Sequence, residues 1–401
     1  MSKPGLSIAG LERMRRVLSG HVERNEIPGI VALLSRGDEV HVETLGRLSL
    51  DDAAPMRRDA IFRIASVTKL ITAVAAMILI EECRLRLDDS IEPWLPELAH
   101  RRVLRSIGSQ LDDTVPAARA ITVRDLLTYR MGFGSVMAMP GTHPIQNLIR
   151  DYRIGGDGPP HPAQALSTDD WIRNLGSLPL LAQPGERWMY NVSADVLGVL
   201  IGRVSGQSFG AFLRERIFEP LGMTDTDFHV PAAKLRRLPG CYSFNRQTSA
   251  LELFDDRVNS EWSKPPAFES GAGGLVSTID DCFAFSRMML NRGSIGQRQI
   301  LSRASVELMT SDQLEPRHRE GAELFFHGYS SWGLGMAVDI AREEIYHSPG
   351  RFGWTGGFGT ALYIDPANDV ISILFTQRLM DSPEPPRVYT DFWATAWAAV
   401  E

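Results

Sequence analysis

Lysine is nearly absent from this chain. Of the 42 Lys plus Arg residues among 401, four are lysine: Lys3, Lys69, Lys234 and Lys264. Arginine therefore supplies positive charge almost everywhere, and a lysine within an apolar stretch requires a chemical reason. Lys69, directly before the apolar run Leu70 to Ile80, is the only lysine placed in this way.

The chain also has few cysteines, no excess of basic charge and no long apolar run. Three widely spaced cysteines exclude a disulfide framework and a thiolate metal cluster. The net charge of −7 leaves no basic footprint for a phosphate backbone, so no nucleic acid partner is expected. The run Leu70 to Ile80 is too short to span a bilayer, and charged residues interrupt Met1 to Arg16 where a signal peptide would be apolar. The sequence predicts a cytoplasmic protein with no membrane span.

Common cofactor and metal motifs are missing. No H-E-x-x-H, C-x-x-C or G-x-x-x-x-G-K-[ST] pattern occurs, and the nine histidines are scattered. We therefore expect no metal and no cofactor.

The two ends of the chain have similar patterns. Apolar spacing predicts helices at both ends, and alternation with turn residues predicts strands inside them. The predicted elements are helices Leu11 to Arg24 and Val388 to Val400, and strands Gly29 to Ser35, Val40 to Leu45, Trp332 to Ile340, Thr360 to Asp365 and Val370 to Gln377. The simplest arrangement is one antiparallel sheet covered by the terminal helices.

The middle of the chain is predicted to be helical. Four helical segments are separated by loops rich in Pro and Gly: Val123 to Tyr129, Thr168 to Leu175, Ala194 to Val204 and Phe209 to Phe218. We predict an α/β protein of the α+β type. Its sheet domain comprises residues 1–87 and 229–401, residues 88–228 form an inserted helical subdomain, and the active site lies in the cleft between them.

Ser66 and Lys69 are the candidate reactive pair. A spacing of i, i+3 at the start of a helix places both side chains on one face. A serine hydroxyl becomes a good nucleophile when a base takes its proton, and a buried lysine can be that base because burial disfavours the ammonium form. Arginine does not deprotonate in proteins and could not serve. A surface lysine is the simpler interpretation, but a helix this apolar on every side is buried.

Phe62 to Lys69 resembles the S-x-x-K motif of the serine β-lactamase and penicillin-binding-protein superfamily, and the resemblance covers most of the chain. Further segments resemble the family in the same order: Ile121 to Thr128 with Met131 to Gly134, Pro184 to Ser193, Glu219 to Thr226, and Ser270 to Thr278. The resemblance implies a β-lactamase/transpeptidase-like fold, with an antiparallel sheet, flanking terminal helices and an inserted helical subdomain.

The resemblance also implies roles for further residues. Tyr190 would share the base role with Lys69 and protonate the leaving alcohol. The segment Trp354-Thr355-Gly356-Gly357 would line the cleft, and the N–H groups of Ser66 and Gly357 would form the oxyanion hole. The two glycines are also compatible with a plain bulge or turn.

Two departures from the family pattern bear on the substrate. Val192 stands where class C β-lactamases have the asparagine of Tyr-x-Asn, and Trp354 stands where they have a cation. A tryptophan at this position resembles the pattern of family VIII carboxylesterases. We assign Trp354, Thr355, Gly356 and Val192 to substrate binding, and an apolar indole and a valine favour uncharged esters over anionic β-lactams.

The sequence thus predicts a serine hydrolase that cleaves small or medium carboxylic esters through a Ser66 acyl-enzyme. Three alternatives remain open: an acyltransferase with the same acyl-enzyme, a penicillin-binding DD-peptidase or weak β-lactamase, and a non-catalytic binding protein. The expected partner is a small-molecule ester.

Overall fold

The computed structural model describes residues 5–155 and 158–401, and its centre is an eight-stranded antiparallel sheet. The strands follow the order β12-β13-β14-β15-β16-β1-β2-β3. Their bounds are β1 Gly29–Arg36, β2 Glu39–Ser49, β3 Asp52–Pro55, β12 Ser330–Trp332, β13 Ala337–Asp339, β14 Phe352–Gly356, β15 Thr360–Asp365 and β16 Val370–Thr376. The N-terminal hairpin joins the C-terminal strands where Leu33 of β1 pairs with Ile373 of β16, as the sequence predicts.

Strand β1 shows why the sheet needs cover on both faces. Val31 and Leu33 belong to one apolar cluster, whereas Ile30, Ala32 and Leu34 on the opposite face belong to another. Successive strand residues point to opposite faces, so a continuous apolar run means that both faces are buried.

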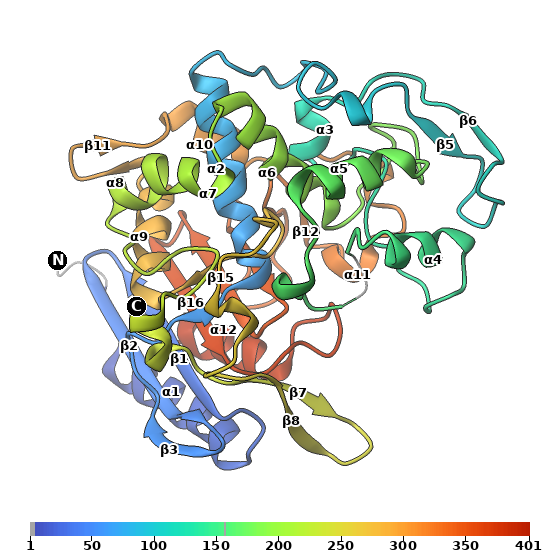
Figure 1. The fold of residues 1–401 in the computed structure, drawn as a ribbon. Coiled ribbons are helices and arrows are strands. Elements are labelled where there is room, and N and C mark those ends of the chain that lie inside the picture. The colour runs from blue at the N-terminus through green and yellow to red at the C-terminus, as the bar shows by residue number, and fades with distance from the viewer. Residues whose placement is uncertain (1–4, 156–157) are drawn as a thin grey trace.

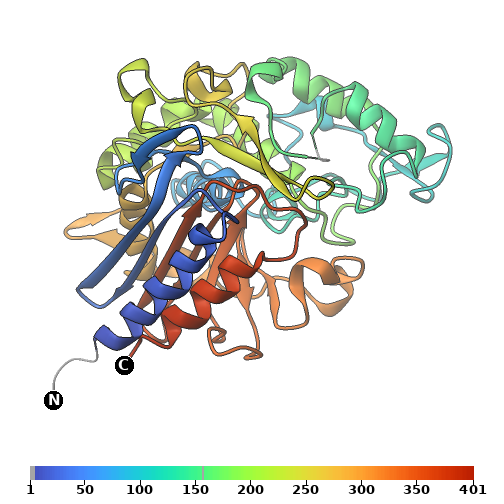
Figure 2. The same cartoon turned by 90° about the horizontal axis from the view of Figure 1, so that it is seen from below.

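The terminal helices α1 (Ile8–Glu23) and α12 (Arg387–Trp397) cover one face of the sheet. They pack against each other, and Figure 2 shows them side by side in front of the strands. Met14 and Leu18 of α1 and Phe392 of α12 are buried in the cluster that also holds Ile30 and Leu374.

The opposite face packs against α9 (Ile279–Leu290), and α2 (Thr68–Glu81) joins this side to the helical part of the molecule. Helix α2 is buried along Thr68 to Leu79, which matches its uniformly apolar sequence. It contacts α6 (Val192–Ser205), which in turn contacts three other helices (Figure 1). The remaining helices are α3 Val123–Leu127, α4 Pro144–Asp151, α5 Thr168–Ser177, α7 Phe209–Leu213, α8 Glu219–Leu221, α10 Arg303–Met309 and α11 Glu323–Phe326.

Among the described residues, four two-stranded ladders lie outside the main sheet. They pair β4 (Phe62–Arg63) with β9 (Val276–Ser277), β5 (Arg102–Leu104) with β6 (Thr114–Pro116), β7 (Cys241–Asn245) with β8 (Ala250–Asp255), and β10 (Ser294–Ile295) with β11 (Arg298–Gln299). The β4–β9 ladder joins two segments beside the start of α2: α2 begins just after β4, and the loop before β9 contacts it where the Leu275 N–H donates to Thr68 Oγ1 at 3.3 Å.

Two predicted elements are wrong in detail. The strand predicted at Trp332 to Ile340 is a hairpin of β12 and β13, because the chain reverses between them at Gly333 and Gly335, and Gly335 has a φ of +84°. The helix predicted at Phe209 to Phe218 is regular only in α7 and continues as a π turn over Arg214–Phe218.

The domain limits 1–87 plus 229–401 and 88–228 stay a prediction. All strands of the main sheet come from the two outer segments.

Within the described ranges, no single helix is long and apolar enough to cross a membrane. The bent pair Val192–Ser205 and Phe209–Leu221, which meet at 79°, passes that test by length and composition.

Candidate active site

Ser66 lies in a single 3₁₀ turn, Ala65–Val67, between β4 and α2. The preceding Ala65 has a φ of +44°, in the left-handed region that costs energy for a residue with a Cβ atom. Two hydrogen bonds hold the turn: the Ile64 N–H donates to Leu275 O at 3.0 Å, and the Thr360 hydroxyl donates to Ile64 O at 2.9 Å. The nucleophile is therefore presented on a backbone that its surroundings constrain.

Lys69 is buried one turn later, with 1% of its surface exposed. Its Nζ lies 2.8 Å from Ser66 Oγ, 2.8 Å from Asn191 Oδ1 and 2.5 Å from Ala272 O. Burial lowers the pKa of Lys69 to about 7, against the opposing attraction of Asp195. The carbonyl oxygens of Asn191 and Ala272 can only accept. A neutral Lys69 amine has two N–H groups and one lone pair. The two N–H groups donate to the two carbonyl oxygens, so the lone pair faces Ser66 Oγ.

Tyr190 approaches Ser66 from the other side. Its Oη lies 2.8 Å from Ser66 Oγ and accepts a hydrogen bond from Trp354 Nε1 at 2.8 Å. Burial raises the pKa of Tyr190 to about 12, so it is a neutral phenol at physiological pH. Because the indole N–H can only donate, the phenol proton points to Ser66. When Lys69 is neutral, the donors run in one direction, from Trp354 through Tyr190 and Ser66 to Lys69.

Strand β14 carries the segment Trp354 to Gly356 along the site. Thr355 and Gly357 line the cavity, whereas Gly356 packs against Ile64 and Thr360. Neither the Ser66 nor the Gly357 N–H donates to an acceptor in the described part of the chain, which leaves both free for a substrate oxygen.

Val192 and Asn191 differ from the expectation. The Val192 side chain, assigned to substrate binding from sequence, is 1% exposed at the start of α6 and does not line the cavity. The amide comes one residue earlier: Asn191, with a φ of +83°, lines the cavity and contacts Lys69. With a ψ of −67°, Asn191 is the centre of a γ-turn in which the Val192 N–H donates to Tyr190 O at 3.3 Å, a rare conformation that the sequence does not signal.

Asp195 is a further site residue that the sequence reasoning missed. Its Oδ1 accepts from Ser270 Oγ at 2.6 Å and from the Ala272 N–H at 3.0 Å, and the residue is 6% exposed. Burial raises its pKa. Asp195 lies one helical turn after Asn191, and only the tertiary structure brings it to the 270–272 loop that carries the oxygen facing Lys69.

A second serine motif is excluded as the nucleophile. Gly206 to Gly210 reads G-x-S-x-G, the pattern of a nucleophile elbow when it joins a strand to a helix. Here it joins two helices, and Ser208 caps α7 by accepting from the Ala211 N–H at 3.2 Å. Ser208 does not line the cavity.

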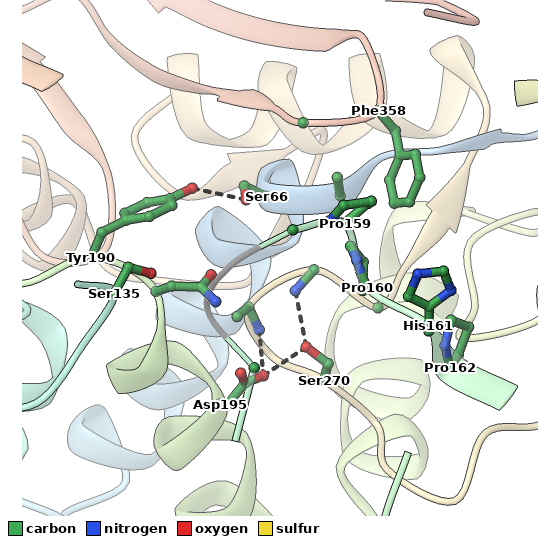
Figure 3. Close-up of a pocket in the computed structure, with 18 of the residues that line it drawn as sticks. Ser66, Ser135, Pro159, Pro160, His161, Pro162, Tyr190, Asp195, Ser270 and Phe358 are labelled. Carbon is green, nitrogen blue, oxygen red and sulfur yellow. Dashed lines mark hydrogen bonds between the residues drawn. The ribbon is translucent and has the colours of Figure 1, made fainter. Parts of the chain in front are cut away.

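A cavity of about 830 Å³ opens beside Ser66. Figure 3 shows Tyr190 and Ser135 on one side of Ser66, Phe358 on the other, and Asp195 with Ser270 along a further wall. Most of the lining is apolar, from Ile149, Ile154, Leu166, Trp171, Trp262, Phe268, Phe325 and Phe358. Among the described residues, no group of three or more His, Cys, Asp or Glu side chains is placed to hold a metal ion.

Comparison with known proteins supports the family resemblance. An uncharacterized protein of Mycobacterium tuberculosis (strain CDC 1551 / Oshkosh) is 36% identical over 364 residues, which cover 88% of this chain and 87% of that protein. Lovastatin esterase of Penicillium rubens is 33% identical over 393 residues, with 90% and 91% covered.

A solved structure shares the fold. EstCE1, described as a hydrolase with promiscuous acyltransferase activity, superposes with a TM-score of 0.81 at 23% identity, over 98% of this chain and all of that one. The Beta-lactamase family pattern matches residues 14–391, and the chain therefore belongs to the beta-lactamase family.

Proposed function

We propose that this protein is a serine hydrolase that cleaves carboxylic esters through an acyl-enzyme on Ser66. The observation that carries the proposal is the directed hydrogen-bond chain in which Ser66 accepts from Tyr190 and faces the amine of Lys69. The esterase name of the relative at 33% identity supports it.

Acylation begins at Lys69. The neutral amine takes the Ser66 proton while Oγ attacks the ester carbonyl, and the N–H groups of Ser66 and Gly357 bind the developing oxyanion. When the intermediate collapses, the ester C–O bond breaks and the departing alkoxide takes the phenol proton of Tyr190. The acyl-enzyme then holds a tyrosinate and a lysine ammonium.

Deacylation reverses the proton movements. The Tyr190 phenolate accepts a proton from water as the water oxygen attacks the acyl carbon, and Ser66 Oγ leaves with the proton from Lys69. The products are the acid and the starting enzyme, so protons balance without a cofactor.

Trp354 favours an uncharged substrate. It packs against Tyr190 and Phe325, and its only N–H group in the side chain donates to Tyr190 Oη. A substrate carboxylate would find no cation at this position, which weighs against the DD-peptidase and β-lactamase alternatives.

The test is turnover of p-nitrophenyl acetate and butyrate by wild type and Ser66→Ala, with a chromogenic cephalosporin alongside. We expect ester cleavage that the variant reduces at least 10³-fold, because the hydroxyl is the nucleophile, and slow cephalosporin opening. A burst followed by a stall would favour the acyltransferase. Equal rates in the variant would overturn the assignment of Ser66, and no turnover of any substrate would favour the binding protein.

A further inference from the structure

One carboxylate oxygen in the cavity wall has no partner. Both hydrogen bonds of Asp195 fall on Oδ1, and Oδ2 has none within the part of the chain that the structure describes. Asp195 is 6% exposed and lines the cavity (Figure 3). Among the described residues, Oδ2 is not one of the fully buried side-chain atoms without a partner, so it is accessible from the cavity and a ligand can supply its donor.

We propose that Asp195 binds a cationic amino group on the acyl part of the ester, so that amino-substituted acyl groups are preferred substrates. This inference rests on the ester-hydrolase function proposed above.

The position of Asp195 assigns this contact to the acyl half of the substrate. The alcohol oxygen must reach Tyr190 Oη, which belongs to a wall with Trp354 and Phe325. Asp195 belongs to a different wall, with the 270–272 loop, on the side of Lys69 where the Ala272 carbonyl accepts from Nζ. A substrate group that extends past Lys69 to Asp195 therefore remains bound after the alcohol leaves.

The charges around the cavity favour a cation over a neutral donor. The positive charge of Lys69 would lower the pKa of Asp195, but Lys69 must be neutral to act as the base. Arg150 and Arg153 line the outer part of the same cavity. The Arg150 side chain is 70% exposed and pairs with Asp151, and Arg153 donates to the Gln164 carbonyl. An ammonium group would bring both the missing charge and the missing donors.

The experiment compares p-nitrophenyl esters of hexanoate, 6-hydroxyhexanoate and 6-aminohexanoate at pH 8. The readout is the kcat/KM ratio of the amino ester to the unsubstituted ester. Asp195→Asn keeps an amide oxygen for Ser270 and Ala272 and removes the charge, so we expect this ratio to fall about tenfold or more. Asp381→Asn is the matched control: this carboxylate also lines the cavity but already pairs with Arg378 at 2.8 Å, and the ratio should not change.

A ratio that is equal in wild type and Asp195→Asn, or an equal gain for the hydroxy ester, would overturn the inference while leaving the hydrolase function intact. Failure of the wild type to cleave the unsubstituted ester would overturn both. If Asp195→Asn does not fold, inhibition of wild-type p-nitrophenyl acetate cleavage by hexylamine and by hexanol tests the inference instead. Hexylamine should be a competitive inhibitor with an inhibition constant at least about tenfold lower than that of hexanol. Equal inhibition constants would contradict the inference.

Discussion

At the scale of single residues, the proposed chemistry depends on which protons Lys69 and Tyr190 carry. Both side chains are buried against Ser66, and burial moves their pKa values in opposite directions, to about 7 and about 12. Each shift favours the neutral form, because a charged group loses solvation inside the protein. The lysine becomes a base and the tyrosine remains an acid at the same pH.

This assignment predicts the pH dependence of activity. The base must be neutral, so kcat/KM for p-nitrophenyl acetate should rise with pH through a midpoint near 7 and then level off, with no loss from Tyr190 ionisation below about pH 11. Lys69→Arg should reduce kcat/KM at least 10³-fold because arginine stays protonated. An active Arg variant, or a flat profile between pH 5.5 and 8.5, would contradict the base role.

At the scale of elements, the end of β14 positions the 3₁₀ turn that carries Ser66. Thr360 of β15 pairs with Gly356 and donates to Ile64 O just before that turn. The two adjacent glycines differ in their surroundings: a Cβ atom on Gly356 would overlap with Ile64 O and Thr360 Oγ1, whereas one on Gly357 meets open space. The close approach of strand and turn therefore requires glycine at one position only.

Alanine substitutions at Gly356 and at Gly357 should have different effects on stability. Gly356→Ala should lower the free energy of unfolding by about 1–3 kcal/mol, because the new methyl group displaces the turn from the strand, and should reduce ester turnover at least tenfold. Gly357→Ala should change stability by less than about 0.5 kcal/mol. Urea unfolding followed by circular dichroism measures both, and equal stability of the two variants would argue against the contact.

At the scale of the whole molecule, the site lies where the sheet meets the helical part of the chain. Ser66 and Lys69 come from the segment after β4. Tyr190 comes from the loop before α6, Asp195 from the first turn of α6, and Trp354 from the main sheet. Packing α2 against α6 buries Lys69 beside the carbonyl oxygens of Asn191 and Ala272, in a helix whose other buried residues are mostly apolar. Burial of the Lys69 amine therefore lowers the stability of the folded protein.

That cost predicts a dependence of stability on pH. Because the pKa of Lys69 is lower in the folded state than its ordinary value of 10.5, the unfolded chain binds more protons between about pH 7 and 10.5, and this contribution to stability rises with pH across that window. Lys69→Met removes the titrating group, so it should be more stable than wild type at pH 7, by about 2 kcal/mol or more. The difference should shrink towards pH 10.5.

Guanidinium unfolding of wild type and Lys69→Met at pH 7 and pH 10 measures the difference, with Lys234→Met as the control, since that lysine is partly exposed and paired with Asp225. A wild type more stable than Lys69→Met at pH 7 would contradict a neutral buried lysine.

The sequence by itself determined the fold class, the family and the pairing of the chain ends, because these depend on apolar periodicity and on ordered motifs. It also singled out Ser66, Lys69 and Tyr190, whose assignment as catalytic residues stays a prediction. Only the tertiary structure placed Asn191 instead of Val192 beside Lys69, and Asp195 against the 270–272 loop. The positive φ of Asn191, just before α6, turns its side chain towards the cavity and that of Val192 into the core, and apolar spacing does not encode such a single backbone angle.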